Sequence, residues 1–345
     1  MKISIVIPIY NESENILKLL NSIFDQKVKK MEVILIDDGS TDQTKKIIKP
    51  YLKKVKYFKI KNSGVARARN IGIKKSNGSI IIFFDGDVIL KKNSLNNFIK
   101  YFKENKNVNI LQGTWHKEFL EKTNYITKHL LLKLDFNFNE IYKKQKKHHT
   151  FKGIKVSELA TGCLGIRKKI ANKFFFNENY KSSGGEEFEL GSKISKIYDI
   201  YLTPKIKVYH KFEGLFETLR RIFYRTINYS IVYFNLNNKE KKNLNKSNGL
   251  SVPKRDKNNI FVIFSLIFFL ILGIFNSIFF AFSIVSFSLF LINNLKFLKH
   301  IRKNLNYFSC LKSLFIELLI IFCKLIAISL AVFIVYILHS TKLKL

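Results

Sequence analysis

The chain has 345 residues, a hydrophobic content of 47% and a formal net charge of +35 at pH 7. Such a charge can indicate a nucleic-acid partner, but the lysines are spread along the chain and no aromatic-interleaved basic motif of RNA-binding proteins is present. Attraction to anionic lipid headgroups explains the charge better. The three cysteines, Cys163, Cys310 and Cys323, give no disulfide framework. We therefore expect a membrane partner and no nucleic-acid partner.

Apolar runs alternate with helical patterns along the first part of the chain, which predicts an α/β fold with a parallel, doubly wound sheet. Pro8 cannot donate a hydrogen bond to a neighbouring strand, so it marks the end of the first predicted strand. Ser13 is the expected N-cap of the helix that follows. The predicted strands are Ile3–Ile9, Val33–Ile36, Val55–Ile60 and Ile80–Phe84, with helices at Ile16–Ile23, Gln43–Lys49 and Val65–Lys75 between them.

The triplet Asp85-Gly86-Asp87 follows the continuous apolar strand Ile80–Phe84. Ligands of open α/β sheets bind beyond the carboxyl ends of the strands, where these two carboxylates are expected. Carboxylates are hard oxygen ligands that suit a divalent cation shared with substrate phosphates. A simple Asp-Gly turn is the alternative interpretation.

Three loops are predicted at the same edge of the sheet, and their chemistry is complementary. Asp37 can accept hydrogen bonds from a base or ribose, Arg67 and Arg69 can bind phosphate, and Asp85 and Asp87 can hold a metal. A nucleoside diphosphate needs all three. The chain has no Walker-type phosphate loop and no Gly-x-Gly-x-x-Gly after the first strand, which argues against a kinase or a dinucleotide oxidoreductase.

Four segments together resemble glycosyltransferase family 2, a large family of inverting enzymes. They are Ser4–Glu12, Ile34–Asp42, Gly64–Gly72 and Phe84–Asp87. The resemblance covers roughly residues 1 to 225. It implies a GT-A fold, which is Rossmann-like with a mostly parallel sheet, and a nucleotide-diphosphate sugar as the donor.

The resemblance also implies roles for single residues of the donor site. Tyr10 would lie against the base, Asp37 would hydrogen-bond the base, and Glu12 would lie in the nucleotide pocket. Asp85 and Asp87 would hold the ribose and a divalent metal, Mg²⁺ or Mn²⁺. Pro8, Ser40, Arg67 and Arg69 lie in the same motifs and are assigned to the nucleotide site with them.

The second half of the site is expected around Thr161–Lys168, since a comparable segment lines the donor-sugar pocket in the family. Gly162 would let the backbone approach a ligand closely, or would serve a tight bend. Cys163 has no expected chemical role and suits a packed position. Trp115 would either stack on a sugar or fill a core. We assign Gly162, Cys163, Trp115 and Glu186 to the sugar or acceptor pocket.

The segment Gly184–Leu190 resembles the family's Glu-Asp motif, whose second acid is the general base. That position is Glu187 here, one methylene longer than aspartate. Glu186 and Glu189 are the alternatives, and an acidic first helical turn is the structural explanation. His210 follows a predicted strand and is assigned as a metal ligand by the resemblance, or is structural.

The C-terminal part is predicted to span a membrane. Residues 260–292 include no charged side chain, and a single helix of this length would be about 50 Å long, against a hydrocarbon core of about 30 Å. A break at Gly273–Ser277 and basic residues on both flanks favour a helical hairpin over one tilted helix. Residues 314–339 form a further predicted span, in which Glu317 and Lys324 share a face and can turn towards other helices.

The helix predicted at Leu215–Leu236 is basic and amphipathic, so it lies either at the membrane interface or on the catalytic domain. The expected organisation is a GT-A domain at 1–236, with a nucleotide-binding half at 1–110 and an acceptor-side half at 111–236. A linker at 237–259 and a transmembrane region at 260–345 follow.

The expected function is metal-dependent, inverting transfer of a sugar from a nucleotide-diphosphate sugar to a hydroxyl of a lipid-linked or cell-surface glycan. The alternative is a polyprenyl-phosphate glycosyl synthase, whose acceptor is already an anion. A processive polymer synthase would need more membrane spans and a Gln-x-x-Arg-Trp motif, which the chain lacks. A non-catalytic carbohydrate-binding protein would not need the acids at 85, 87 and 187. We expect a multi-pass protein of the cytoplasmic membrane whose catalytic domain lies in the cytosol, where nucleotide sugars are made.

Overall fold

The computed structural model describes residues 1–116, 123–145, 154–156, 158–180, 184–210, 214–236, 241 and 254–340. The chain divides into two compact units. The first comprises Met1–Glu121, Ile141–Lys211 and Asn243–Asn248, and the second Lys122–Glu140, Phe212–Lys242 and Gly249–Leu345. The sequence predicts a boundary after residue 236, whereas the structure groups 212–242 with the C-terminal helices. The predicted linker at 237–259 lies mostly outside the described residues.

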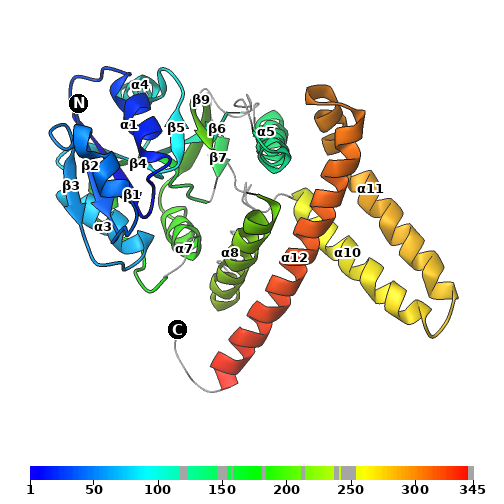
Figure 1. Ribbon diagram of the computed structural model, residues 1–345. Helices are drawn as coiled ribbons and strands as arrows, with labels where there is room; N and C mark the ends of the chain where they lie inside the picture. Colours follow the sequence, from blue (N-terminus) through cyan, green and yellow to red (C-terminus); the bar gives the residue numbers. More distant parts are fainter. Residues whose placement is uncertain are drawn as a thin grey trace. The chain divides into compact units, whose positions relative to one another are not determined.

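The first unit is built on a nine-stranded sheet in the described part of the chain (Figure 1). The strand order is β3-β2-β1-β4-β8-β6-β9-β5, and β7 also pairs with β9. The strands are β1 (Ile3–Ile9), β2 (Met31–Asp37), β3 (Lys56–Lys59), β4 (Ile80–Phe84), β5 (Val88–Leu90), β6 (Ile110–Trp115), β7 (Ile154–Val156), β8 (Cys163–Arg167) and β9 (Ile200–His210).

The sheet is mixed rather than mostly parallel. Strands β1 to β4 are parallel to one another, as the alternation of strands and helices predicts. Strand β8 then runs antiparallel to both β4 and β6, and β5 and β7 run antiparallel to β9. The apolar pattern of a buried strand reports its burial and not its direction, so the sequence of β8 could not reveal this reversal.

Pro8 lies inside β1 rather than at its end, because β1 continues to Ile9. The ladder between β1 and β4 stops at the pair Val6–Phe83, two residues before Pro8. The missing N–H of Pro8 therefore costs no bond to β4.

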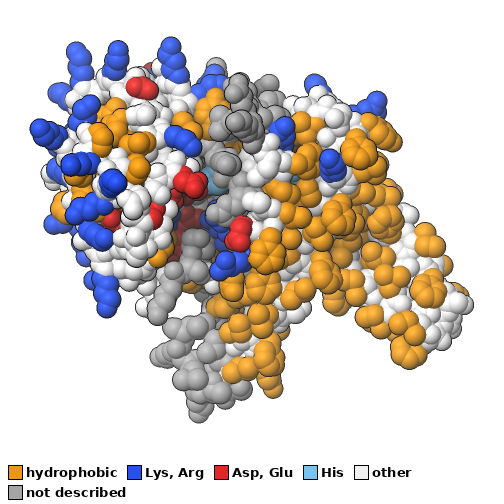
Figure 2. Space-filling model, in the orientation of Figure 1, with side chains coloured by type: hydrophobic (Ala, Val, Ile, Leu, Met, Phe, Trp, Pro, Cys, Tyr) orange, Lys and Arg blue, Asp and Glu red, His pale blue; other side chains and the backbone are white. Residues whose placement is uncertain are grey.

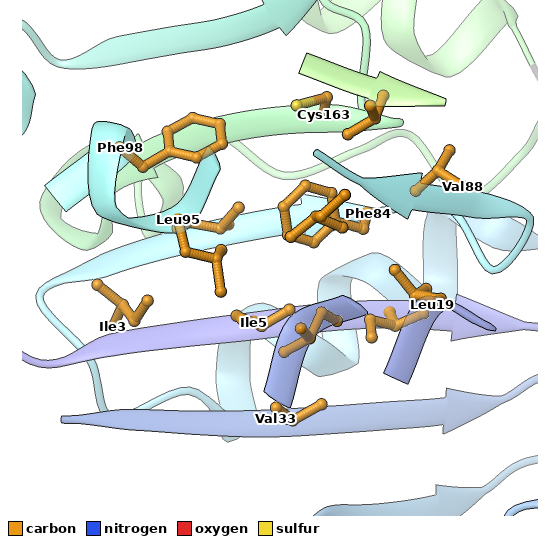
Figure 3. Packing of buried hydrophobic residues seen from close by; sticks show 14 of the residues in the cluster. Ile3, Ile5, Leu19, Val33, Phe84, Val88, Leu95, Phe98 and Cys163 are labelled. Carbon is orange, nitrogen blue, oxygen red and sulfur yellow. The ribbon is translucent and has the colours of Figure 1, made fainter. Parts of the chain in front are cut away.

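Helices cover both faces of this sheet (Figure 1). Ile3 and Ile5 of β1 pack with Leu19 and Phe98 from the helices of one face (Figure 3). Helix α3 packs closely on the other face, since a Cβ at Gly72 would lie 2.2 Å from Val6 Cγ1. The helices are α1 (Ile16–Phe24), α2 (Thr44–Ile47), η1 (Lys49–Tyr51), α3 (Val65–Lys75), α4 (Ser94–Glu104), α6 (Lys168–Ala171) and α7 (Gly185–Ile194). Asn15, and not Ser13, is the N-cap of α1.

The second unit is helical, and three of its helices are long and apolar enough to cross a membrane. Hydrophobic side chains cover these helices in Figure 2. A short turn after Gly273 separates the first two, which are about 30 and 40 Å long because each extends beyond the apolar run. The helices of this unit are α5 (Tyr125–Gln145), α8 (Leu215–Asn235), α10 (Lys254–Gly273), α11 (Ile278–Asn304) and α12 (Tyr307–Ser340).

Helix α8 packs along α12, which neither of the two predicted positions for α8 anticipated. Leu219 and Ile222 lie against Ile316 and Ile320 at one end of the contact. At the other end, Ile227 packs with Ala327 and Ala331. The apolar stripe of α8 is thus used within the helical unit.

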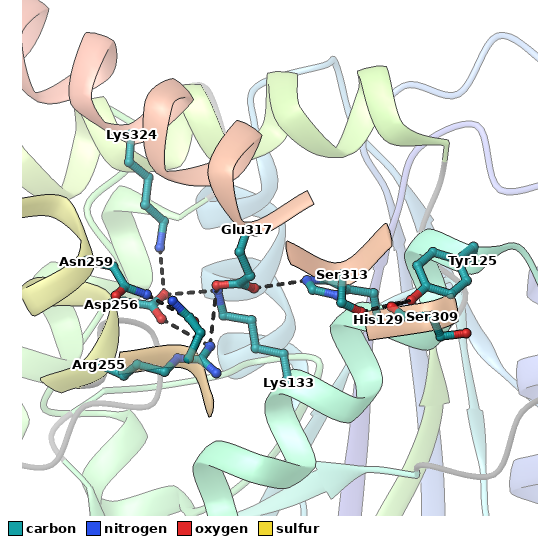
Figure 4. A network of polar contacts seen from close by, with 11 residues as sticks. Tyr125, His129, Lys133, Arg255, Asp256, Asn259, Ser309, Ser313, Glu317 and Lys324 are labelled. Carbon is teal, nitrogen blue, oxygen red and sulfur yellow. Dashed lines mark hydrogen bonds and ion pairs between the residues drawn. The ribbon is translucent and has the colours of Figure 1, made fainter. Parts of the chain in front are cut away.

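Charged side chains inside this unit form a buried network between α5, α10 and α12 (Figure 4). The Glu317 carboxylate is fully buried and lies 2.9 Å from Lys133 Nζ and 2.9 Å from His129 Nε2. Asp256 lies 3.1 Å from Lys133 Nζ and 3.0 Å from Lys324 Nζ. Glu317 and Lys324 therefore turn towards the neighbouring helices, as their spacing predicts.

We expect Glu317→Gln to destabilise the helical unit, because it leaves Asp256 as the only buried carboxylate among the cations of the described network. Removing one partner of a buried ion pair costs about 3 kcal/mol, which should lower the unfolding temperature of the detergent-solubilised protein by roughly 10 °C. Glu104→Gln is the control, since Glu104 pairs with Lys100 at 3.9 Å on an exposed surface. Equal unfolding temperatures for the two variants would contradict a stabilising role of the network.

Candidate active site

The loops after β1 and β2 are tied together at the carboxyl edge of the parallel strands. The backbone N–H of Asn11 donates to Ser40 Oγ at 3.0 Å, and the N–H of Glu12 donates to Thr44 Oγ1 at 2.8 Å. Asn11 adopts a left-handed conformation with φ 54°, which an asparagine tolerates better than most residues. Tyr10 beside it is 47% exposed.

Asp37 does not face the solvent, in contrast to its expected contact with the base. Its side chain is fully buried, accepts the N–H of Ser40 at 2.7 Å and accepts the Tyr57 hydroxyl. Ser40 is also buried, and its hydroxyl accepts the bond from Asn11. Asp37 and Ser40 therefore shape the loop, and Pro8 is likewise buried within β1.

Arg69 is buried beneath the site rather than displayed as a phosphate-binding fork. Only 3% of its side chain is exposed, whereas Arg67 on the same helix is exposed. Its Nη2 lies 3.0 Å from Asp85 Oδ1 and 3.5 Å from Glu187 Oε1, and its Nη1 lies 2.9 Å from Glu186 Oε1. One guanidinium thus joins the loop after β4 to the start of α7.

Three carboxylates gather around the loop after β4: Glu12, Asp85 and Asp87. Burial, together with the charge of Asp87, raises the pKa of Glu12 to about 7. Glu12 lies directly over Gly86, where a Cβ would be 2.8 Å from Glu12 Cγ. Negative charge therefore exceeds the positive charge available at this point.

These carboxylates are suited to bind a divalent cation whose remaining ligands come from the substrate. Among the described residues, no group of three His, Cys, Asp or Glu side chains is arranged to hold a metal by itself. His210 Nε2 lies 3.3 Å from Asp87 Oδ2, because Val88 pairs with His210 between β5 and β9. One or two carboxylates with phosphate oxygens are a usual environment for Mg²⁺, and a cation would relieve the excess negative charge.

Among the described residues, contacts reach both carboxylate oxygens of Glu186 and of Glu189, but only Oε1 of Glu187. Glu186 is fully buried, is paired with Arg69 and accepts the N–H of Gly184 at 2.6 Å, so it does not line a sugar pocket. Burial raises the pKa of Glu189, but the hydrogen bonds that it accepts from Lys193 and Asn177 outweigh this effect and hold the pKa below its ordinary value.

Glu187 is held by one oxygen only. Its side chain is 10% exposed, and the hydroxyl and N–H of Thr161 both donate to Oε1, the N–H at 3.2 Å. Within the described part of the chain, these contacts and that of Arg69 all go to Oε1, so Oε2 is available to accept a proton.

The remaining predicted pocket residues divide between site and core. Gly162 lies beside Asp85, since a Cβ there would be 3.0 Å from Asp85 Oδ2. Cys163 is packed in the core, where burial raises the pKa of its thiol to about 12, so it does not line a pocket. Trp115 is partly buried at the end of β6, opposite Val208, and packs against the same core. Thr161 lies in the segment expected to line the pocket, but the sequence predicts no role of its own for it, because no sequence pattern marks a side chain whose role comes from one tertiary contact.

Residues 4–175, about half of the chain, match the family model described as Glycosyl transferase family 2. The chain belongs to this family. The match contains the loops after β1, β2 and β4, and it ends before Glu186 and Glu187, whose roles therefore depend on their geometry.

Relatives of this glycosyltransferase match it over a limited part of their length. An uncharacterized glycosyltransferase of Rickettsia bellii is 41% identical over 106 residues, which are 30% of this chain and 15% of that protein. Poly(ribitol-phosphate) beta-N-acetylglucosaminyltransferase TarS of Staphylococcus aureus is 34% identical over 110 residues, which are 30% of this chain and 19% of TarS.

A solved structure confirms the fold. Mannosyltransferase PcManGT from Pyrobaculum calidifontis, in complex with GDP-Man and Mn²⁺, superposes with a TM-score of 0.52 at 15% identity. The superposition covers 70% of this chain and 67% of that one. The catalytic domain of this glycosyltransferase therefore has the GT-A fold that its sequence predicts, and the apolar helices follow it.

The raised pKa of Glu12 makes the stability of the metal-free protein depend on pH. The folded protein keeps the Glu12 proton up to about pH 7, while the unfolded chain loses it near pH 4.5. Stability attributable to this group therefore falls as the pH rises from 4.5 to 7. We expect Glu12→Gln to match the parent protein at pH 4.5 and to exceed its stability at pH 8 by about 1–2 kcal/mol, because the site is partly solvated.

Denaturant unfolding in EDTA at pH 4.5, 6 and 8 would measure this difference. Glu14→Gln, in an exposed position of the same loop, controls for the loss of one carboxylate. If the stabilities of both variants differ from that of the parent protein equally at every pH, the pKa of Glu12 is not raised in the folded protein.

Proposed function

We propose that the protein is a membrane-anchored, inverting glycosyltransferase that moves a sugar from a nucleotide-diphosphate sugar to a hydroxyl of a lipid-linked or cell-surface glycan. One observation carries the proposal: a single guanidinium, that of Arg69, contacts both a donor-side carboxylate, Asp85, and the candidate base, Glu187. Asp85 would hold the leaving diphosphate and Glu187 would activate the acceptor. Both contact the same guanidinium, so the two groups lie close together.

The donor would occupy the edge formed by the loops after β1, β2 and β4. Tyr10 offers a surface for the base, and the exposed Arg67 offers charge to the phosphates. Asp87, with Asp85, Glu12 or His210, would hold Mg²⁺ or Mn²⁺, which would neutralise charge on the leaving diphosphate. The Mn²⁺ and GDP-Man of PcManGT support this assignment.

Glu187 would act as the general base. Its Oε2 would take the proton of the acceptor hydroxyl while that oxygen forms a bond to the anomeric carbon. The bond between that carbon and the diphosphate oxygen breaks on the opposite face, and the electron pair leaves with the diphosphate. A single displacement of this kind inverts the anomeric centre and needs no covalent enzyme intermediate. The beta linkage named for TarS is compatible with inversion of an alpha-linked donor.

The acceptor class is inferred from the helical unit and from the relatives. Three apolar helices would keep the enzyme at a membrane, close to lipid-linked or surface glycans. TarS and the minor teichoic acid biosynthesis protein GgaB of Bacillus subtilis, which is 34% identical over 110 residues, are both named for envelope polymers. Basic residues flank the predicted hairpin on both sides, which favours a cytosolic position of the catalytic domain in a multi-pass protein of the cytoplasmic membrane.

Glu187→Gln tests the chemistry directly. We expect sugar transfer to fall by about 100-fold or more, because the acceptor proton loses its base, while donor binding is kept. Transfer would be assayed with a panel of UDP-, GDP- and other nucleotide sugars, and binding by the thermal shift that nucleotide and Mn²⁺ or Mg²⁺ produce together.

Glu189→Gln, two residues further along α7 and outside the site, is the matched control. Unchanged turnover of Glu187→Gln would instead support the polyprenyl-phosphate synthase, whose anionic acceptor needs no strong base. A parent protein without transfer on any donor would favour a non-catalytic binding protein.

The membrane assignment predicts a defined fractionation. The full-length protein should remain in the membrane pellet after extraction with alkaline carbonate and should dissolve only in detergent, because spanning helices cannot leave the hydrocarbon core. Release of the protein by carbonate or by high salt would show peripheral attachment and would refute the spanning helices.

A further inference from the structure

Thr161 contacts the candidate base more closely than any other uncharged residue described. Its hydroxyl and its backbone N–H both donate to Glu187 Oε1, and its side chain is fully buried. We propose that Thr161 is a positioning residue that orients the Glu187 carboxylate, an inference that rests on the proposed function of Glu187.

Glu187 needs such an anchor because its side chain has three rotatable bonds. Arg69 Nη2 lies 3.5 Å from Oε1, which is too long for a strong hydrogen bond, and Arg69 makes its shorter contacts to Asp85 and Glu186. The two Thr161 donors therefore fix the rotation of the carboxylate. With Oε1 held from one side, Oε2 is presented to an acceptor hydroxyl.

Thr161 is itself held by a rigid support. Gln112, a buried residue of β6, accepts the N–H of Ala160 at 2.8 Å and donates to the carbonyl of Glu158 at 2.8 Å. Two residues after Thr161, strand β8 begins at Cys163, which pairs with Phe84 at the end of β4. The loop that carries Thr161 is thus fixed to the central strands on both sides.

This support also relates the base to the donor side of the site. Phe84 directly precedes Asp85, and Gly162 lies against the Asp85 carboxylate. A residue that orients the base is therefore built into the same loop that approaches the donor-side acid. A misplacement of about 1 Å at such a point can reduce turnover about 100-fold.

Thr161→Val, which keeps the shape of the side chain and removes the hydroxyl, is the first test. We expect kcat to fall by about 10- to 100-fold, while the KM for the nucleotide sugar and the unfolding temperature stay near the parent values. Thr161→Ser keeps the hydroxyl and should retain kcat within about threefold. A normal kcat for Thr161→Val would overturn the proposal, and so would a Thr161→Ser variant as impaired as Thr161→Val.

A double-mutant cycle with Glu187→Asp separates positioning from a general structural role. Aspartate is one methylene shorter and should lose the contact with Thr161, so Thr161→Val should cause no further loss of kcat in that background. Losses that multiply would show that Thr161 does not act through residue 187.

The Glu187→Gln variant separates an error in the proposed base, Glu187, from an error in the proposed positioning role of Thr161. If Glu187→Gln is active, the proposed base is wrong, and the role of Thr161 falls with it. If Glu187→Gln is inactive while Thr161→Val is fully active, the base is retained and only the positioning role is refuted.

Discussion

The catalytic domain depends on one buried cation placed among carboxylates. Without the Arg69 guanidinium, the half-buried Asp85 and the buried Glu186 and Glu187 would bring uncompensated negative charge together from two separate segments, and mutual repulsion would oppose folding of this edge. With it, the loop after β4 and the first turn of α7 are held together. The same contact leaves Glu187 Oε2 and the outer face of the Asp85–Asp87 loop available for chemistry.

The fold of the first hundred residues is readable from sequence because local pattern and burial agree there. Helix α3 occupies Val65–Lys75 and strand β4 occupies Ile80–Phe84, the bounds that the sequence predicts for them. Beyond this region the pattern is less specific. Strand β8 has the composition of any buried strand, so its antiparallel direction follows only from its neighbours in space.

The site residues show where sequence patterns lose information. Arg67 and Arg69 look equivalent in the motif, yet two residues along a helix turn a side chain by about 200°, so only one can point into the protein. Asp37 is a polar residue at a strand end, but the pattern does not reveal that Ser40 and Tyr57 occupy its carboxylate. The resemblance points to Glu187 as the second acid of its motif, whereas the contacts that occupy Glu186 and Glu189 are visible only in the structure.

In the helical unit, as in the catalytic domain, buried charged side chains are paired with charges of opposite sign. Its apolar runs give the number and approximate place of the long helices, because a continuous hydrophobic stretch is a strong local signal. The polar residues within and beside these runs give the packing, since each buried charge must find a partner of opposite sign. Lys133 supplies that partner for both Asp256 and Glu317, although it comes from α5, a helix inserted between β6 and β7 in the chain. The motif order and the family resemblance predict that residues 111–236 form one acceptor-side half. The charge pairing explains why the first part of α5 belongs instead with the apolar helices: its Lys133 and His129 are the groups that make a carboxylate at position 317 tolerable inside them.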